Sequence, residues 1–258
     1  MHNFIFGIYP YIALAVLVIG SAARYERDPF TWKSSSSQLL RRNQLVLGSV
    51  LFHVGVLVIF VGHLFGLLTP LWLIELFGIG HSAKQILAVA VGGIAGVMAL
   101  AGGIILIHRR LVDPRIRATS STMDIVILSL LLVQLALGLL TIFVSLQHLD
   151  GEEMVRFMNW AQGIFTFDPN AAAYTEGASI LFQLHIFLGL TIFLLFPFSR
   201  LVHMLSGLAA PFRYLLTRTG YQIVRTRRSV ALPKHDGPVR AVQASQAPLS
   251  RKTAQPAE

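Results

Sequence analysis

Five apolar stretches, each about 20 residues long, constrain most strongly what this chain can fold into. They cover residues 4–23, 45–68, 86–107, 125–147 and 178–199. A transmembrane helix needs about 20 mainly apolar residues, and in lipid every backbone polar group must be bonded within the protein. Only 13% of the residues are charged, against about 25% in soluble domains. We therefore predict an all-α integral membrane protein, a bundle of five transmembrane helices.

The net charge of +9 predicts an orientation in the membrane rather than a nucleic-acid partner. Nineteen of the Lys and Arg side chains lie within residues 24–42, 109–117 and 200–258, whereas only Lys84 and Arg156 lie in the alternate connections. Basic residues accumulate on the cytoplasmic side of membrane proteins. We expect a periplasmic N-terminus and a cytoplasmic C-terminus, with membrane lipid around the bundle.

The chain divides into three predicted parts. Residues 1–203 hold the five apolar stretches and form the membrane domain. Residues 204–230 are basic and aromatic, which favours a cytoplasmic tail that docks on a partner. Residues 231–258 are rich in Pro, Ala, Gln and Ser and have few bulky apolar groups, so we expect them to be disordered.

Four histidines in or beside two of the apolar stretches predict the chemistry. His53 and His63 lie within the second stretch, and His185 and His203 straddle the end of the fifth. An imidazole in hydrocarbon is costly unless it is paired or bound, and histidine is a common axial ligand of haem iron. The chain has no cysteine, which excludes thiolate ligation, iron–sulfur clusters and covalent C-x-x-C-H attachment. Two non-covalent haems, each held by two histidines, are the predicted cofactors.

The alternating direction of the helices predicts how these histidines pair. His63 and His185 both lie toward the outside, and His53 and His203 both lie toward the cytoplasm. The second apolar stretch separates His53 and His63 by about 15 Å, whereas His185 and His203, expected on one helix face, lie about 27 Å apart. This mismatch requires tilted haems, a bend at Pro197, or a position for His203 beyond the regular helix.

Lys84 has two interpretations. It is one of two basic residues on the outer side, where a lysine often extends its amine to the membrane surface. Its level near the outer histidines also predicts a hydrogen-bond donor to a quinone carbonyl. Two other functions remain open at this point: a quinone-linked cytochrome b of a different cytoplasmic reductase, and a channel or transporter with a histidine relay. The relay is disfavoured because the histidine-bearing stretches contain neither Asp nor Glu.

Several longer motifs resemble one family over residues 8–228. They are IYPYIA (8–13), SSSSQLLRR (34–42), LFHVG (51–55), FVGHLFGLLTP (60–70), RRLVDPRIRATS (109–120), DIVILSLLLVQLALGLLTI (124–142), WAQGIFTF (160–167), QLHIFLGLTIFLLFPFSRLVH (183–203) and RYLLTRTGYQIVR (213–225). The chain resembles the gamma subunit of membrane-bound respiratory nitrate reductase, the cytochrome b that oxidises quinol in the bacterial cytoplasmic membrane.

The resemblance implies roles for the histidines that agree with the predicted pairing. His53 and His203 would hold the inner haem b, and His63 and His185 the outer one, as axial ligands of the iron. Electrons would pass through both haems to an iron–sulfur beta subunit, and from it to a molybdenum-containing alpha subunit that reduces nitrate.

The resemblance also implies a quinol site beside the outer haem. Lys84 and Gly62 are the residues implicated there, and the substrate would be menaquinol or ubiquinol. Nitrate itself would be reduced in another chain, because this sequence has no ligands for molybdenum.

Overall fold

The computed structural model describes residues 1–28, 31–32, 42–76, 78, 80–147 and 149–206. All regular structure within these ranges is helical, without strands. The described residues belong to one compact unit, Met1–Phe212. The predicted docking tail beyond residue 206 and the predicted disordered tail, residues 231–258, lie outside the described residues.

Five helical segments are long and apolar enough to cross a membrane, as predicted. They are Phe4–Arg27, Arg42–Leu68, His81–Val112, Thr122–Ser145 and Ile180–Phe198. The first consists of η1 (Phe4–Ile8), α1 (Tyr9–Ala15), η2 (Val16–Gly20) and α2 (Ser21–Arg27); the others are α3 (Arg42–Leu68), α5 (His81–Val112), α7 (Thr122–Ser145), and α9 (Ile180–Leu195) followed by η5 (Phe196–Phe198). The predicted all-α, five-span architecture is confirmed.

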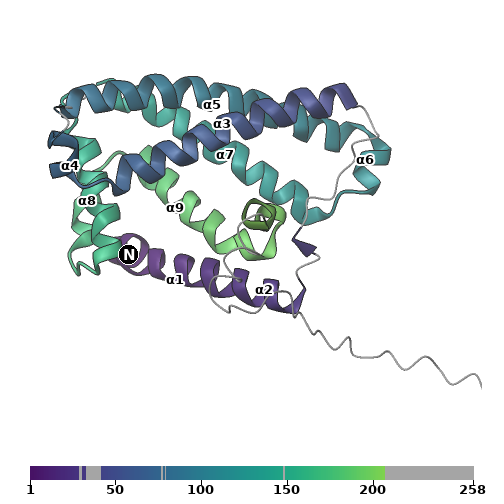
Figure 1. The fold of residues 1–258 in the computed structure, drawn as a ribbon, viewed down its shortest axis with the longest axis horizontal. Coiled ribbons are helices and arrows are strands. Elements are labelled where there is room, and N and C mark those ends of the chain that lie inside the picture. The colour runs from purple at the N-terminus through teal and green to yellow at the C-terminus, as the bar shows by residue number, and fades with distance from the viewer. Residues whose placement is uncertain (29–30, 33–41, 77, 79, 148, 207–258) are drawn as a thin grey trace, which may run out of the picture. The chain divides into compact units, whose positions relative to one another are not determined.

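Shorter helices lie between the spans and after the last one. They are α4 (Leu71–Leu76), α6 (Pro114–Ala118), α8 (Glu152–Thr166), η4 (Ala171–Thr175) and η6 (Arg200–Leu205). Helices α4 and α8 lie at the same end as the N-terminus, and α6 lies at the other end (Figure 1). We call the end with α8 the α8 end, and the end with α6 the α6 end.

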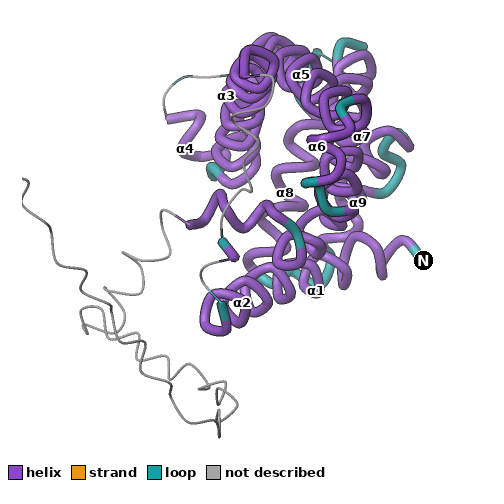
Figure 2. Tube along the Cα trace, turned by 90° about the vertical axis from the view of Figure 1, so that its right-hand side faces the viewer, coloured by secondary structure: helices purple, strands orange, loops and turns teal. Residues whose placement is uncertain are grey.

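The spans pack in the order α3, α5, α7, α9 and α1. Figure 2 looks along the bundle and shows these helices as an arc, with α3 and α9 on different sides of it. The closest crossing joins α3 to α5, where a Cβ on Gly55 would lie 2.5 Å from the carbonyl oxygen of Ala95 and one on Gly102 would collide with the backbone of Phe52. Glycine therefore allows α3 to lie directly on α5 at this crossing.

The first span is fixed to the α8 end by hydrogen bonds. The indole of Trp160 in α8 donates to the carbonyl oxygen of Phe6 at 2.9 Å, and the hydroxyls of Tyr9 and Thr191 lie 3.0 Å apart between α1 and α9. Buried polar groups in lipid need such partners. The first span is therefore bonded to both α8 and α9.

At the α6 end, a carboxylate joins three elements. Ser121 caps α7 and accepts from the backbone amide of Asp124, whose own side chain accepts from the amide of Ser121. The same carboxylate lies 3.8 Å from the guanidinium of Arg110 and 3.7 Å from that of Arg200. The ends of α5 and η6 thus meet at the start of α7.

Candidate functional site

The four predicted histidines form two pairs across the space between α3 and α9. The ring centres of His53 and His203 are 6.2 Å apart, and those of His63 and His185 are 6.1 Å apart. His53 and His63 are both exposed, although they lie in the interior of a 27-residue helix. The structure brings together the pairs that the alternating helix directions predict.

The ring separations fit a metal between each pair. Two imidazoles joined directly by a hydrogen bond would have centres about 5 Å apart. Metal–imidazole bonds of about 2 Å, with about 1 Å more from each nitrogen to its ring centre, give about 6 Å. The observed ring-centre distances of 6.1 and 6.2 Å are too long for a direct hydrogen bond between the rings and are compatible with a metal between them.

The donor chemistry also fits, because three of the four rings are held with one nitrogen turned away from the backbone. In each of these three, Nδ1 donates to a carbonyl oxygen of its own helix: His53 to Ser49 at 2.7 Å, His63 to Ile59 at 2.9 Å, and His203 to Arg200 at 2.6 Å. A proton on Nδ1 leaves the lone pair on Nε2 for a metal, and such bonds also fix the ring orientation. Each of these three imidazoles can therefore offer Nε2 to a metal.

Two ligands per site are what a porphyrin iron needs. Among the described residues there is no group of three or more His, Cys, Asp or Glu side chains that could hold a metal ion. A metal bound by protein alone would need such a group, whereas a haem would need only two histidines from the protein at each site. The residues present therefore fit two haems.

The end of α9 resolves the mismatch in histidine spacing. The α-helix stops at Leu195, η5 follows, and Ser199 is extended with φ −113° and ψ 179° before η6 begins. The short helices after α9 turn away from its axis (Figure 1). The expectation that His185 and His203 share one helix face is wrong, because proline at position 197 cannot donate to the helical ladder and the chain breaks there. His203 lies beyond the regular helix, which was one of the stated alternatives.

Arg24 secures this break and was not predicted. Its Nη1 donates to the carbonyl oxygens of Pro197 at 2.7 Å and Ser199 at 2.8 Å. Its Nε and Nη2 donate to the side chain and backbone of Thr31. Breaks in helices leave carbonyls without partners, but nothing in the sequence indicates which of the basic residues satisfies them.

Lys84, near the start of α5, lies against the end of α3 and close to the pair His63 and His185. Its ammonium donates to the carbonyl oxygen of Gly66 at 2.8 Å and lies 3.0 Å from the sulfur of the fully buried Met158 in α8. Gly66 is three residues after His63, less than one helical turn. Carbonyls at a helix C-terminus attract a cation. The side chain therefore points toward α3 and α8.

Gly62 faces open space. A Cβ built on it would meet nothing within 4 Å, although the residue precedes a ligand candidate in the middle of a span. The absence of neighbouring described atoms distinguishes Gly62 from Gly55, which is pressed against α5. Gly62 thus lies next to His63 in the sequence, and no described atom covers it.

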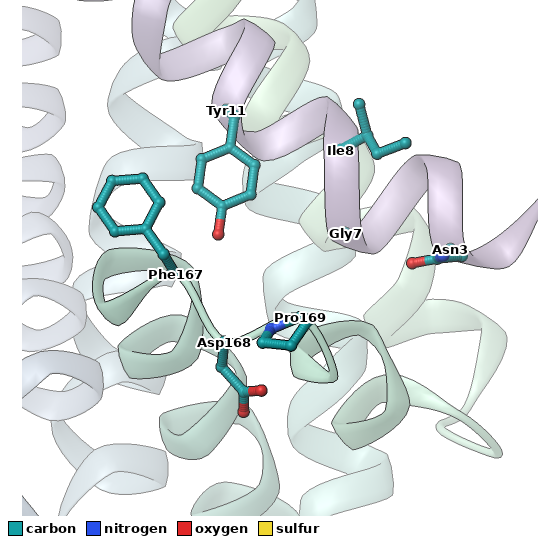
Figure 3. A pocket seen from close by; sticks show the side chains of 7 residues that line it. All are labelled: Asn3, Gly7, Ile8, Tyr11, Phe167, Asp168 and Pro169. Carbon is teal, nitrogen blue, oxygen red and sulfur yellow. The ribbon is translucent and has the colours of Figure 1, made fainter.

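A shallow cleft of about 340 Å³ opens at the α8 end, between the first span and the segment after α8. Its lining residues are Asn3, Gly7, Ile8, Tyr11, Phe167, Asp168 and Pro169 (Figure 3). The rings of Tyr11 and Phe167 are parallel to within 4°, with centres 5.6 Å apart. None of the predicted site residues lines this cleft, so it is separate from the histidine pairs.

Comparison with known proteins agrees with the motifs. The family described as "Nitrate reductase gamma subunit" matches residues 2–227. The respiratory nitrate reductase 1 and 2 gamma chains of Escherichia coli (strain K12) are 50% identical over 227 residues and 51% identical over 228 residues, in each case 88% of this chain and 98% of the relative. The nitrate reductase gamma chain of Bacillus subtilis (strain 168) is 38% identical over 223 residues, 86% of this chain and 97% of that relative.

Proposed function

Because the chain belongs to the nitrate reductase gamma subunit family, as its motifs predicted, we propose that it is the dihaem cytochrome b that anchors a respiratory nitrate reductase and oxidises quinol for it. The family and the five apolar helices make it a multi-pass protein of the bacterial inner membrane. The comparisons favour a nitrate reductase over a different cytoplasmic reductase, the alternative that the histidines alone leave open.

One observation carries the proposal: the two histidine pairs with ring centres 6.1 and 6.2 Å apart. His63 and His185 would hold the outer haem b, and His53 and His203 the inner one. Haems b in these places would supply one-electron transfer from quinol toward an iron–sulfur partner. The chain's own part is to orient the four imidazoles and to surround them with apolar side chains.

Quinol would bind beside the outer pair, between Gly62 and Lys84. The ammonium of Lys84 already donates to Gly66 and has three protons, so it can also donate to a quinone oxygen. Gly62 leaves the adjacent space open. Oxidation of a quinol releases two electrons and two protons, and the protons would leave toward the periplasm because the site lies at the α8 end, which we place outside.

The α6 end would face the cytoplasm and the partner subunits. The basic segments at this end include Arg109, Arg110, Arg115, Arg117 and Arg200, in keeping with the positive-inside rule. The partners would be an iron–sulfur beta subunit and, through it, a molybdenum-containing alpha subunit. The predicted docking tail, residues 204–230, would also bind a partner subunit.

Pyridine haemochrome analysis of the purified full-length chain tests the proposal. We expect close to two haems b per polypeptide. The difference spectrum should show b-type bands that appear on adding a menaquinol or ubiquinol analogue. A chain that binds one haem or none, or haems that no quinol analogue reduces, would refute the proposal.

A further inference from the structure

We propose that Gln134 of α7 is a positioning residue for His185, which it holds from the neighbouring helix. The inference rests on the proposed function, since it takes His185 as the outer haem ligand. It goes further by assigning a role to a polar side chain in the middle of a mainly apolar span.

Helices α7 and α9 interlock at this point through two side chains and two glycines. The amide of Gln134 faces Gly189, where a Cβ would lie 3.2 Å from Nε2. The ring of His185 faces Gly138, where a Cβ would lie 3.0 Å from Cε1. Each polar residue precedes the glycine of its own helix by four positions, about one turn. Each glycine therefore makes room for the polar side chain of the other helix.

His185 lacks the anchor that the other three ligand candidates have. Its Nδ1 is buried and has no hydrogen-bond partner among the described residues. Its ring is instead contacted by Gln134, whose Nε2 lies 3.4 Å from His185 Nε2 and donates to the His185 carbonyl oxygen at 3.1 Å. The orientation of this imidazole thus depends on a different helix.

The same pair of side chains has one unmatched acceptor and one unmatched ring nitrogen. The Oε1 of Gln134 is also buried without a partner in the described part of the chain. Unpaired buried polar atoms are costly. If the imidazole turns to free Nε2 for iron, Nδ1–H can donate to Oε1 and both atoms are satisfied. Gln134 would then do for His185 what the helix carbonyls do for the other three rings.

The test compares Gln134→Leu and Gln134→Glu with Gln183→Leu in the full-length chain. Gln183 is the matched control because it is a glutamine in α9, the helix of His185, and its amide donates to the Ala178 carbonyl at 2.9 Å rather than to the histidine. Loss of an outer-shell partner costs about 10-fold or more in affinity for the bound group. We expect Gln134→Leu to weaken outer-haem binding about 10-fold in a hemin titration and to shift the low-spin EPR signal of that haem alone.

Gln134→Glu separates positioning from packing. It keeps an acceptor of the same shape, so it should retain the outer haem. It should also lower that haem's midpoint potential, because a carboxylate makes the imidazole more electron-rich. The inference is overturned if Gln134→Leu leaves the outer signal and affinity unchanged, if both haems respond equally, or if Gln183→Leu has the same effect. Fewer than two haems in the unmutated chain would instead refute the proposed function itself.

Discussion

Replacing Arg24 by alanine should weaken the inner haem site without touching a ligand. Arg24 connects the first span to the break that carries His203, through hydrogen bonds of 2.7 and 2.8 Å to the carbonyls of Pro197 and Ser199. Hydrogen bonds to a charged group contribute about 1.5–3 kcal/mol each. Since the side chain is half-buried, the lower value applies, and the two bonds together contribute about 3 kcal/mol. That is about a 100-fold change in an equilibrium.

Hemin titration and a redox titration of the purified chain measure this effect. We expect Arg24→Ala to reduce inner-haem affinity by up to about 100-fold, with the outer haem unchanged. Arg27→Ala is the matched control, because Arg27 lies three residues further along the same helix and is exposed. If the inner haem in Arg24→Ala has normal affinity and potential, or if Arg27→Ala causes an equal loss, the Arg24 hydrogen bonds do not support the inner haem site.

Three further predictions concern the quinol site and the orientation. Lys84→Ala should slow quinol oxidation about 10-fold or more at normal haem content, since it removes a hydrogen bond of about 1.5–3 kcal/mol; unchanged steady-state turnover would make Lys84 a structural residue only. Gly62→Ala should raise the KM for a quinol analogue whereas Gly92→Ala should not, although a Cβ meets no described atom within 4 Å at either position; equal kinetics in both variants would refute a ligand beside Gly62. The chain has no cysteine, so Glu152→Cys should react with a membrane-impermeant maleimide in intact cells and Arg117→Cys should not; the reverse result would invert the orientation.

The sequence predicts the spans from the length of the apolar stretches, and it predicts the histidine pairs from the alternating direction of the helices. Apolar length determines where a helix can cross lipid, and the alternation of helix direction assigns His63 to His185 and His53 to His203. These rules need no knowledge of packing. The structure agrees with both predictions.

The details that the sequence does not predict all depend on contacts between distant residues. A straight helix would place His203 on the face of His185. The chain instead breaks at Ser199, next to Pro197, and the freed carbonyls are bonded by Arg24, 173 residues before Pro197. The role of Gln134 depends on Gly189 and on the missing anchor of His185. A polar residue in an apolar span is a signal that could have identified Gln134, although not its partner.

The haem content of two double variants tests most directly which histidines share a haem. If His63 and His185 share one haem, the variant with alanine at both positions should still bind one haem per chain, as should each single variant. The variant with alanine at His63 and His203 should bind none, because each substitution removes a different site. Pyridine haemochrome analysis of the purified chains gives both values. The opposite result would contradict this pairing: one haem retained when His63 and His203 are replaced, and none when His63 and His185 are replaced.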